Sequence, residues 1–507
     1  MNKKFTRLVS LLCACALLGG CVGQSEGSAK PQVTLPAAES VRQAPENDSL
    51  QAYEQSVVLY LPSPDGSQLL AVPRQATLNA SRHEAKALAE LLLSQPATEI
   101  TRPVGGDIAL ALSEADAVEV SGQVATVSLS ASALRLTNEQ LFTVGQALAN
   151  TLCQFGDLQF VNVLISGFQP GMNIAATLPA GCYQANGRED LSSLWARAST
   201  PLNNSRRSFV AALYFPAPSG KGILCEARTL SFQFQDLSSM ALTLLDALSH
   251  GAETLPSMPK CPEFRSLLRE TPTIEETGGT RRLVLRFTDR FNSALIDAGI
   301  TRSVMMASLV YTLTTFLPGI EGVEIRIGDE RINSLTPSGT YNGAGEMISF
   351  SDGLMRRRDF SGFLLAECEL YFAGEDGALH KVYRPVPFYE ARSPRALIEQ
   401  MMQGPQSCDS QTGLKAVLPS GLRPADLLGT AYEDNVNILN FSSQMAALCQ
   451  DMTAEEEKLM IYAMVNTLCR LRGIKRVSFF IQGKQEESLA GHVYLPGDFL
   501  PNLDLVK

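Results

Sequence analysis

The sequence has 507 residues, of which 45% are hydrophobic, and a formal net charge of −10. At roughly 150 residues per domain, this length predicts about three domains, each with enough apolar residues to form a core. An acidic chain lacks the basic surface that nucleic-acid binding needs, so we expect no nucleic-acid partner.

The first 21 residues have the pattern of an export signal. Three basic residues precede an apolar run over residues 8–18, and Leu-Gly-Gly-Cys follows, ending at Cys21. The run is too short to cross a bilayer core of about 30 Å. Its ending resembles a bacterial lipobox, so we expect lipid at Cys21 and a mature chain anchored outside the cytoplasmic membrane. An ordinary signal peptide with a cysteine there by chance is the alternative.

Residues 22–53 are rich in Ser, Ala, Gln, Glu and Pro and contain little that could be buried. Such a composition is typical of flexible linkers. We therefore predict a flexible tether between the lipid and the first folded domain.

A short phrase occurs three times and marks an internal repeat. It is Asn-Thr-Leu-Cys at 150–153 and 466–469, and Tyr-Thr-Leu-Thr at 311–314. An apolar strand follows each phrase and stops at a glycine 16 residues after the threonine. A Leu-Tyr pair opens each copy, at 59–60, 213–214 and 370–371.

The first copy alternates strands and helices. We expect strands over 57–61, 69–78, 117–120, 124–129 and 160–165. Ser81–Glu84 and Thr137–Gln140 have the pattern of capping boxes, so we expect a helix after each.

The other two copies follow the same order. In the second we expect strands over 213–215, 223–234, 281–287 and 323–327, and helices over 237–248 and around Leu309. Residues 251–280, which carry four prolines, show no clear first hairpin strand. In the third we expect strands over 370–372, 380–389, 436–441 and 477–481, and helices opened by Ser393-Pro394 and by the capping box Thr453–Glu456.

This order predicts an α+β protein of three tandem small domains, each a short sheet covered by two helices. The expected domains are 54–185, 207–334 and 362–490, with a C-terminal tail to 507. The linkers between them carry two basic clusters, Arg206-Arg207 and Arg356–Arg358. These clusters could contact anionic wall polymers or lipid head groups. Solvated linker charges are the simpler interpretation.

Eight cysteines follow Cys21, an even number that permits disulfides in an exported chain. Cys153 with Cys182, and Cys225 with Cys261, would each close a loop within one repeat. Pairing of Cys408 with Cys449 and of Cys368 with Cys469 is a further hypothesis. Buried free thiols remain the alternative, because Cys packs well as a small apolar residue.

The pattern resembles the GerM-type sporulation and spore germination domain, found in lipoproteins of endospore-forming bacteria. The resemblance is carried by the opening hairpin, by a helix closing on Gln403-Gly404-Pro405, by a strand such as Val124–Leu129, and by the helix that ends in Thr-Leu. It covers most of 54–185 and 362–490, and 207–330 less well. It implies modules similar to the ring-building domains of the spore-forming secretion apparatus, which act as scaffolds or binding modules without catalytic residues.

The residues themselves give little support to an enzyme. None of the four histidines stands in His-Glu-x-x-His, and no Gly-x-Ser-x-Gly motif occurs. Ser257-Met258-Pro259-Lys260 matches Ser-x-x-Lys, but its proline disfavours the helix start that this motif needs. The glycine-rich stretch 339–345 lacks the lysine of a phosphate loop, and Asp434 to Asn437 imitates only half of a calcium loop. We expect no catalytic, cofactor or metal site.

The sequence therefore predicts a non-catalytic envelope lipoprotein, a scaffold or binding module in sporulation or germination. Its expected partners are the membrane, through the lipid, and envelope or spore-assembly proteins. Self-association and contact with peptidoglycan are further expectations. The alternatives are a solute-binding lipoprotein, which would show two lobes of βαβ rhythm, and a cell-wall hydrolase.

Overall fold

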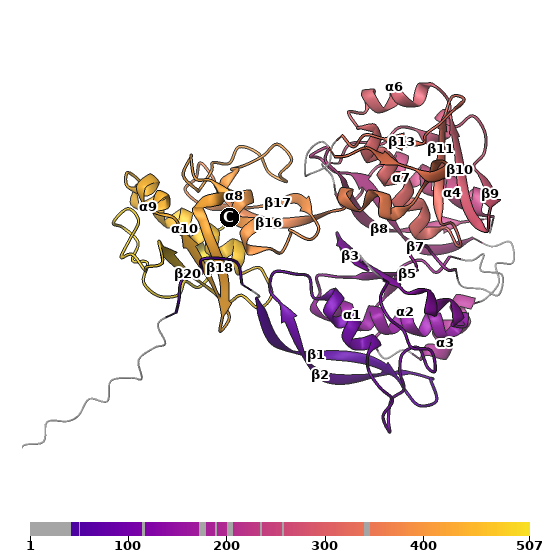
Figure 1. Ribbon diagram of the computed structural model, residues 1–507, viewed down its shortest axis with the longest axis horizontal. Coiled ribbons are helices and arrows are strands. Elements are labelled where there is room, and N and C mark those ends of the chain that lie inside the picture. Colours follow the sequence, from indigo (N-terminus) through magenta and orange to yellow (C-terminus); the bar gives the residue numbers. More distant parts are fainter. Residues whose placement is uncertain are drawn as a thin grey trace, which may run out of the picture. The chain divides into compact units, whose positions relative to one another are not determined.

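The computed structural model describes residues 42–49, 51–113, 117–171, 179–187, 190–199, 206–233, 236–255, 258–338 and 345–507. Residues 44–507 form one compact unit, in which the three repeats follow one another along the chain (Figure 1). The expected signal peptide, Cys21 and most of the expected tether lie outside the described residues.

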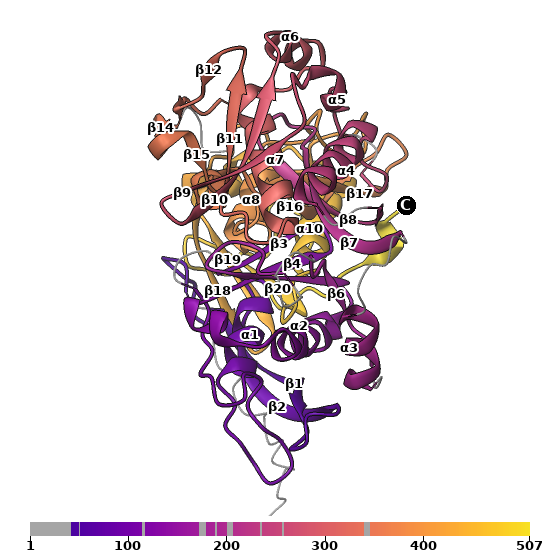
Figure 2. The same cartoon turned by 90° about the vertical axis from the view of Figure 1, so that its right-hand side faces the viewer.

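The first repeat consists of a two-stranded hairpin, a small sheet and two main helices (Figure 2). Its elements are β1 (Ala52–Pro62), β2 (Leu69–Asn79), α1 (Ala85–Leu93), β3 (Val118–Ser121), β4 (Val124–Leu129), α2 (Asn138–Leu152), β5 (Phe160–Ile165) and β6 (Tyr183–Gln184). β4 and β5 are parallel, and α2 makes the crossover between them. Almost every residue of β4 and β5 is buried, as expected for parallel strands covered by a helix.

The second repeat keeps this order with additions. Its elements are β7 (Arg207–Pro216), β8 (Ile223–Phe232), α4 (Leu237–His250), α5 (Phe264–Leu267), β9 (Thr273–Thr277), β10 (Thr280–Phe287), α6 (Arg290–Asp297), α7 (Arg302–Phe316), β11 (Gly322–Ile327) and β12 (Glu330–Arg331). β15 (Leu354–Met355), from the stretch expected to be a linker, also pairs with β11. Every residue of α7 after Arg302 is buried, so α7 is the central helix of this repeat.

The third repeat returns to the plan of the first. Its elements are β16 (Leu365–Ala373), β17 (Leu379–Pro387), α8 (Pro394–Met402), β18 (Leu427–Glu433), β19 (Val436–Phe441), α9 (Ser443–Cys449), α10 (Ala454–Leu468) and β20 (Arg476–Ile481). β19 and β20 are parallel, joined through α9 and α10. The α+β class and the repeated hairpin, helix, sheet and helix are as the sequence predicts.

The second repeat does contain the hairpin strand that the sequence does not reveal. β9 pairs antiparallel with β10, from Thr273 opposite Val284 to Thr277 opposite Thr280. Its sequence, Thr-Ile-Glu-Glu-Thr, lacks apolar alternation because it is a half-exposed edge strand. An ion pair of 2.8 Å between Glu275 and Arg286 of β10 supports it instead.

Helix starts follow their predicted caps with one exception. Thr137, Ser393 and Thr453 accept hydrogen bonds from the backbone as N-caps, and those of α2 and α10 are complete capping boxes. The capping box at Ser81–Glu84 is wrong, because α1 begins after Glu84 without any side-chain cap. The Glu84 carboxylate is bound elsewhere.

Two stretches expected to lie outside the folded domains, a linker and the tether, are in part structured. α3 (Leu191–Ser199) lies within the first expected linker, and its Trp195 ring lies 5.7 Å from that of Phe142. Residues 45–51 of the expected tether pack on β18 and β19, apart from Leu50, which is outside the described residues. Asp48 binds Arg395 at 2.6 Å, and the amide of Ser49 donates to the carbonyl of Thr430 at 2.9 Å. The tether prediction is therefore wrong for this last part.

Within the described residues, no single helix has the length and hydropathy of a membrane span. Only α6 and α7 taken together reach them, and that pair is bent by 102°.

Candidate functional site

The repeated threonine joins the second helix of a repeat to its opening strand. In the first repeat, the amide of Tyr60 donates to the hydroxyl of Thr151 at 3.1 Å. In the second, the amide of Tyr214 donates to Thr312 at 3.0 Å. The third copy differs: the hydroxyl of Thr467 is buried and makes no hydrogen bond. The Leu-Tyr and Thr-Leu phrases thus meet in space.

The residue before this threonine separates the middle repeat from the other two. Asn150 exchanges hydrogen bonds of 2.9 Å with Asn186, and Asn466 does so with Asn502 at 2.8 and 3.0 Å. Each asparagine therefore holds the segment 36 residues further along the chain. The middle copy has Tyr311 here, and it points to a different partner.

The Tyr311 hydroxyl donates to Glu119 of the first repeat at 3.0 Å. Arg357 also binds Glu119, with its Nη2 atom 2.5 Å from the carboxylate, and donates to the Tyr214 hydroxyl at 3.1 Å. The Arg357 guanidinium lies 3.9 Å from the centre of the Tyr311 ring. Burial and the charge of Glu119 hold the pKa of Tyr311 well above its ordinary value, so its phenol remains a donor. We call Glu119, Tyr214, Tyr311 and Arg357 the Glu119 junction.

The Glu119 junction changes the interpretation of the second basic cluster. Side chains at both ends of the Arg357–Glu119 pair are 7% exposed, whereas Arg358 is 78% exposed. Arg357 is therefore not available to an anionic polymer or lipid surface, and that hypothesis is wrong for this residue. Buried charges are retained in proteins only when paired, as this one is.

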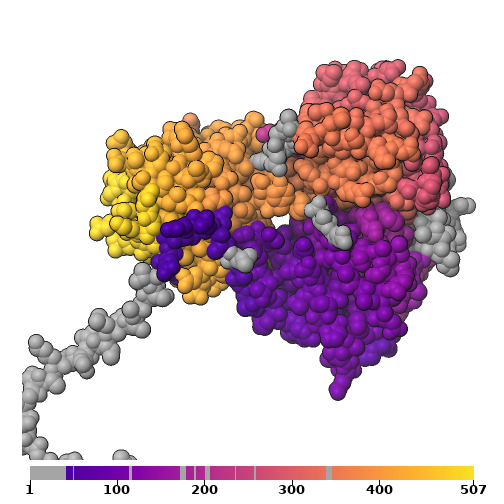
Figure 3. All heavy atoms as spheres, viewed as in Figure 1, coloured from indigo at the N-terminus to yellow at the C-terminus, as the bar shows by residue number. Residues whose placement is uncertain are grey.

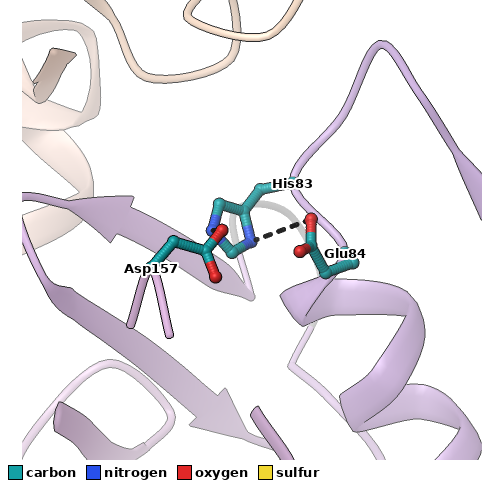
Figure 4. Close-up of side chains that lie close together, drawn as sticks. All are labelled: His83, Glu84 and Asp157. Atoms are coloured by element: carbon teal, nitrogen blue, oxygen red, sulfur yellow. Dashed lines mark ion pairs between the residues drawn. The ribbon is translucent and has the colours of Figure 1, made fainter. Parts of the chain in front are cut away.

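A second charged cluster connects the first repeat to the third. Arg392 and Arg472 bind the Glu84 carboxylate at 2.8 and 2.6 Å, and each lies 3.4 Å from Asp157. His83 lies between the two carboxylates, 3.9 Å from Glu84 and 3.7 Å from Asp157 (Figure 4). We call these five residues the Glu84 junction.

One candidate ligand atom from each of His83, Glu84 and Asp157 lies within 4.8 Å of the other two, as in a metal site. Two guanidinium groups already occupy both carboxylates, and they would repel a divalent cation placed there. Burial also lowers the pKa of His83 to about 4, so the imidazole is neutral at pH 7. The cluster is best explained as an ionic connection between repeats.

An arginine repeated on the second strand of each hairpin secures the first helix. Arg384 donates to the carbonyls of Gln400 and Gly404 at 2.7 Å and is paired with Asp409 at 2.6 Å. Arg228 donates to the carbonyls of Ala247 and Gly251 at 3.3 and 2.8 Å. Arg74 binds the Gln95 side chain at 3.1 Å. The contacts of Arg384 and Arg228 satisfy backbone carbonyls at helix C-termini, where a positive charge is also favoured, whereas Arg74 reaches only a side-chain amide beyond its helix.

Sequence reasoning missed this arginine. Aligning the copies on their Leu-Tyr pairs would have found it, because it stands 14 or 15 residues after the leucine in each. Its place explains why the first helix of the third repeat ends on Gln-Gly-Pro: Gly404 has φ +67° and presents its carbonyl to Arg384.

The eight described cysteines are free thiols, and none of the four expected pairs is formed. Cys182 lies beside β7, where its amide donates to the carbonyl of Val210. Cys225 lies on β8, which pairs with the opposite side of β7. Burial raises the pKa of Cys182 and of Cys261 to about 12, which disfavours the reactive thiolate. In this structure, packing accounts for these cysteines.

The other candidates from the sequence do not come together. His380, on β17, contacts Asp376 of the turn between β16 and β17 at 3.1 Å. Asp434 and Asn435 have positive φ and form the tight turn between β18 and β19. Ser257 and most of the glycine-rich stretch lie outside the described residues.

A polar cavity of about 1230 Å³ lies among the three repeats. Figure 3 shows the gap between the first repeat and the two later ones. Residues from all three repeats line it, among them Tyr53, Asp157, Glu226, Glu367 and Arg472. It is larger than the roughly 300–1,000 Å³ of ordinary small-molecule pockets.

The family described as Germane: Sporulation and spore germination matches the chain three times, at residues 58–170, 212–333 and 369–487. Two solved structures are similar. Tandem GerMN domains of the sporulation protein GerM from Bacillus subtilis are 14% identical, covering 60% of this chain and 100% of that one, at a TM-score of 0.23. The first GerMN domain of the same protein is 20% identical, covering 27% and 98%, also at 0.23. No curated protein matches.

Proposed function

The chain belongs to the Germane family of sporulation and spore germination, and from this membership we propose that it is a non-catalytic, lipid-anchored scaffold of the cell envelope. Three Germane matches in one chain are the observation that carries the proposal. A protein built from repeats of one module, with no other kind of folded domain described, is suited to holding partners at fixed separations.

The charged groups support a structural role. Glu84, Glu119 and Glu226 are buried carboxylates of the kind that catalytic sites use, but each is bound by arginines or backbone amides. A general acid or nucleophile needs a group that is free to meet a substrate. The pairing therefore favours assembly over catalysis.

The proposal includes a lipid at Cys21 and a position outside the cytoplasmic membrane. Fractionation of cells that express the wild-type chain or a Cys21→Ala variant tests the anchor. We expect the wild type with the membranes and the variant in the soluble extracytoplasmic fraction. Equal membrane association of both would refute lipid anchoring at this residue.

The role itself is tested by tagging the chain in its source organism and following it through sporulation. Enrichment at the engulfing septum, with a spore-formation defect on deletion, is the expected result. Uniform localisation in vegetative cells with normal spores would contradict it.

A cell-wall hydrolase is the second class to test. The purified chain should release no muropeptides from peptidoglycan. Release that disappears on one acidic or serine substitution would replace the scaffold by an enzyme. The solute-binding alternative loses support, since three hairpin-led repeats are not the two lobes that it requires.

A further inference from the structure

The cavity is bordered by a strand edge that is left open in only one repeat. In an antiparallel pair, alternate residues direct their amide and carbonyl groups toward the partner strand or away from it. Just after β16, the amide of Gly374 donates to the carbonyl of Ala378 across the hairpin, whereas Ala373, the last residue of β16, exchanges two hydrogen bonds with Lys415 on the other side. Odd-numbered residues of β16 therefore point away from β17.

Both ends of this outer edge are occupied. The carbonyl of Leu365 accepts a hydrogen bond from Ser121 at 2.6 Å, and Ala373 is bound to Lys415 at 2.7 and 3.2 Å. Between them, the backbone groups of Glu367, Glu369 and Tyr371 have no hydrogen-bond partner among the described residues. Ala366 to Glu369 line the cavity.

The same edge is covered in the first two repeats. Gln154 bonds both the amide and the carbonyl of Val58 on β1, at 2.9 and 3.2 Å. Thr312 and Ser308 bond the amide and carbonyl of Tyr214 on β7, at 3.0 and 2.5 Å. Uncovered strand edges are a liability that proteins usually block, so covering is the expected state.

In the third repeat, different residues stand at the positions whose side chains cover this edge in the other two repeats. Glu369 corresponds to Val58 when the Leu-Tyr pairs are aligned, and Arg470 corresponds to Gln154 when the Thr-Leu phrases are aligned. Arg470 binds the Glu369 carboxylate at 2.9 Å and leaves the backbone uncovered. Thr467, the counterpart of Thr151 and Thr312, is buried and without a hydrogen bond.

From this arrangement we propose that an extended segment of a partner protein enters the cavity and pairs with β16 at Glu367 and Glu369, the two outward residues of this edge that line it. Strand addition of this kind obtains affinity from main-chain hydrogen bonds and specificity from alternate side chains. Pairing with two outward residues needs about three partner residues, roughly 10 Å of strand at about 3.3 Å per residue.

The partner segment should carry a basic side chain. Glu367 faces the cavity, and no described residue forms an ion pair with it. The Glu367 side chain is exposed at the cavity, desolvation there raises the pKa of its carboxyl, and the carboxyl has no counter-ion among the described residues. A lysine or arginine of the segment opposite Glu367 would supply one.

This inference rests on the proposed scaffold function and adds the chemistry of the partner. The probe is a fluorescein-labelled eight-residue peptide of alternating Lys and Val, titrated into the full chain and followed by anisotropy. One comparison peptide has N-methyl groups along one edge, and another has Gln in place of Lys. Hydrogen exchange of segment 365–373 is measured with and without the probe.

We expect the probe to bind and to slow exchange in segment 365–373. N-methylation should weaken binding at least tenfold, and Gln for Lys about threefold. Glu367→Pro removes an outward amide and leaves the β16–β17 bonds intact, so it should weaken binding at least tenfold. Gln75→Pro is the matched control, because it lies on the outward side of β2, where Pro73 already stands.

Absence of probe binding, or binding that N-methylation and Glu367→Pro leave unchanged, would overturn the inference. A concentration-dependent increase in mass of the chain alone, abolished by Glu367→Pro, would identify a second copy as the occupant and also overturn it. If Glu367→Pro does not fold, the methylated peptide and hydrogen exchange still decide. Septal localisation of the chain without probe binding would refute this inference and leave the scaffold role intact.

Discussion

Both charged junctions connect two repeats through ion pairs, but they differ in how deeply the charges are buried. The Glu119 junction, between the first and second repeats, has both charges buried, with aromatic rings around the guanidinium. The Glu84 junction, between the first and third repeats, has one buried carboxylate, but its arginine side chains are 17% and 28% exposed. A buried pair loses more when one partner is removed, because the remaining charge cannot return to water. The middle repeat is therefore expected to be joined to the first by the more sensitive connection.

The largest effect should come from the Glu119 junction. Arg357→Ala leaves Glu119 buried and unpaired, which typically costs about 3–5 kcal/mol. Chemical denaturation of Arg357→Ala measures this loss of stability. Arg358→Ala, measured under the same conditions, is the matched control. The control changes an arginine that is 78% exposed, and it should cost less than about 0.5 kcal/mol. Equal losses in both variants would refute the distinction.

Acidification should act through the Glu84 junction, which contains a histidine. Burial lowers the pKa of His83 from 6.5 to about 4. Between these two pH values the unfolded chain binds a proton at His83 and the folded chain does not. Stability is then lost as the pH falls from about 6.5 to about 4, by up to about 3 kcal/mol.

His83→Asn should flatten this part of the stability curve. The asparagine oxygen can still accept from the amide of Ala85, as the His83 ring does at 3.1 Å. An unchanged slope between pH 4 and 6.5 would show that His83 does not titrate as described.

Removal of the shared carboxylate should cost less at the more exposed junction. Glu84→Gln frees two arginines that water can still reach, so we expect a loss of about 1–2 kcal/mol. The loss should diminish in high salt, since partly exposed pairs are screened. A salt-independent loss as large as that of Arg357→Ala would make the two junctions equivalent.

The smallest predicted effect is the loss of one threonine hydroxyl, and it should differ between the first and third repeats. Thr151→Val removes the acceptor of the Tyr60 amide and should cost about 1 kcal/mol. Thr467→Val removes a hydroxyl that is buried without a partner, so it should be neutral or stabilising. Thermal unfolding of both variants gives the comparison, and an equal loss in both would contradict it.

The architecture could be predicted from the sequence because the signals of the repeat are local. Apolar spacing, the caps at Thr137 and Thr453 and the recurring Leu-Tyr and Thr-Leu phrases all depend on neighbours in the chain. β9 was not predicted, because an edge strand needs no apolar alternation. The Ser81–Glu84 box failed because two arginines about 300 and 390 residues away compete for Glu84.

The junctions could not be predicted, because they depend on which surfaces meet. Nothing near Arg357 in the sequence distinguishes it from Arg358, yet one is buried and the other exposed. The exchange of Asn150 for Tyr311 was visible, but its meaning required Glu119 of the preceding repeat. The open edge of β16 likewise became evident only when three hairpins could be compared in space.

We expect the two junctions to make the three repeats one cooperative unit. Trp195, the single tryptophan, packs on the first repeat, whereas circular dichroism reports on the whole chain. Urea unfolding followed by both signals should give one coincident transition for the wild type. Arg357→Ala should separate the two curves. Separate transitions already in the wild type would contradict the claim.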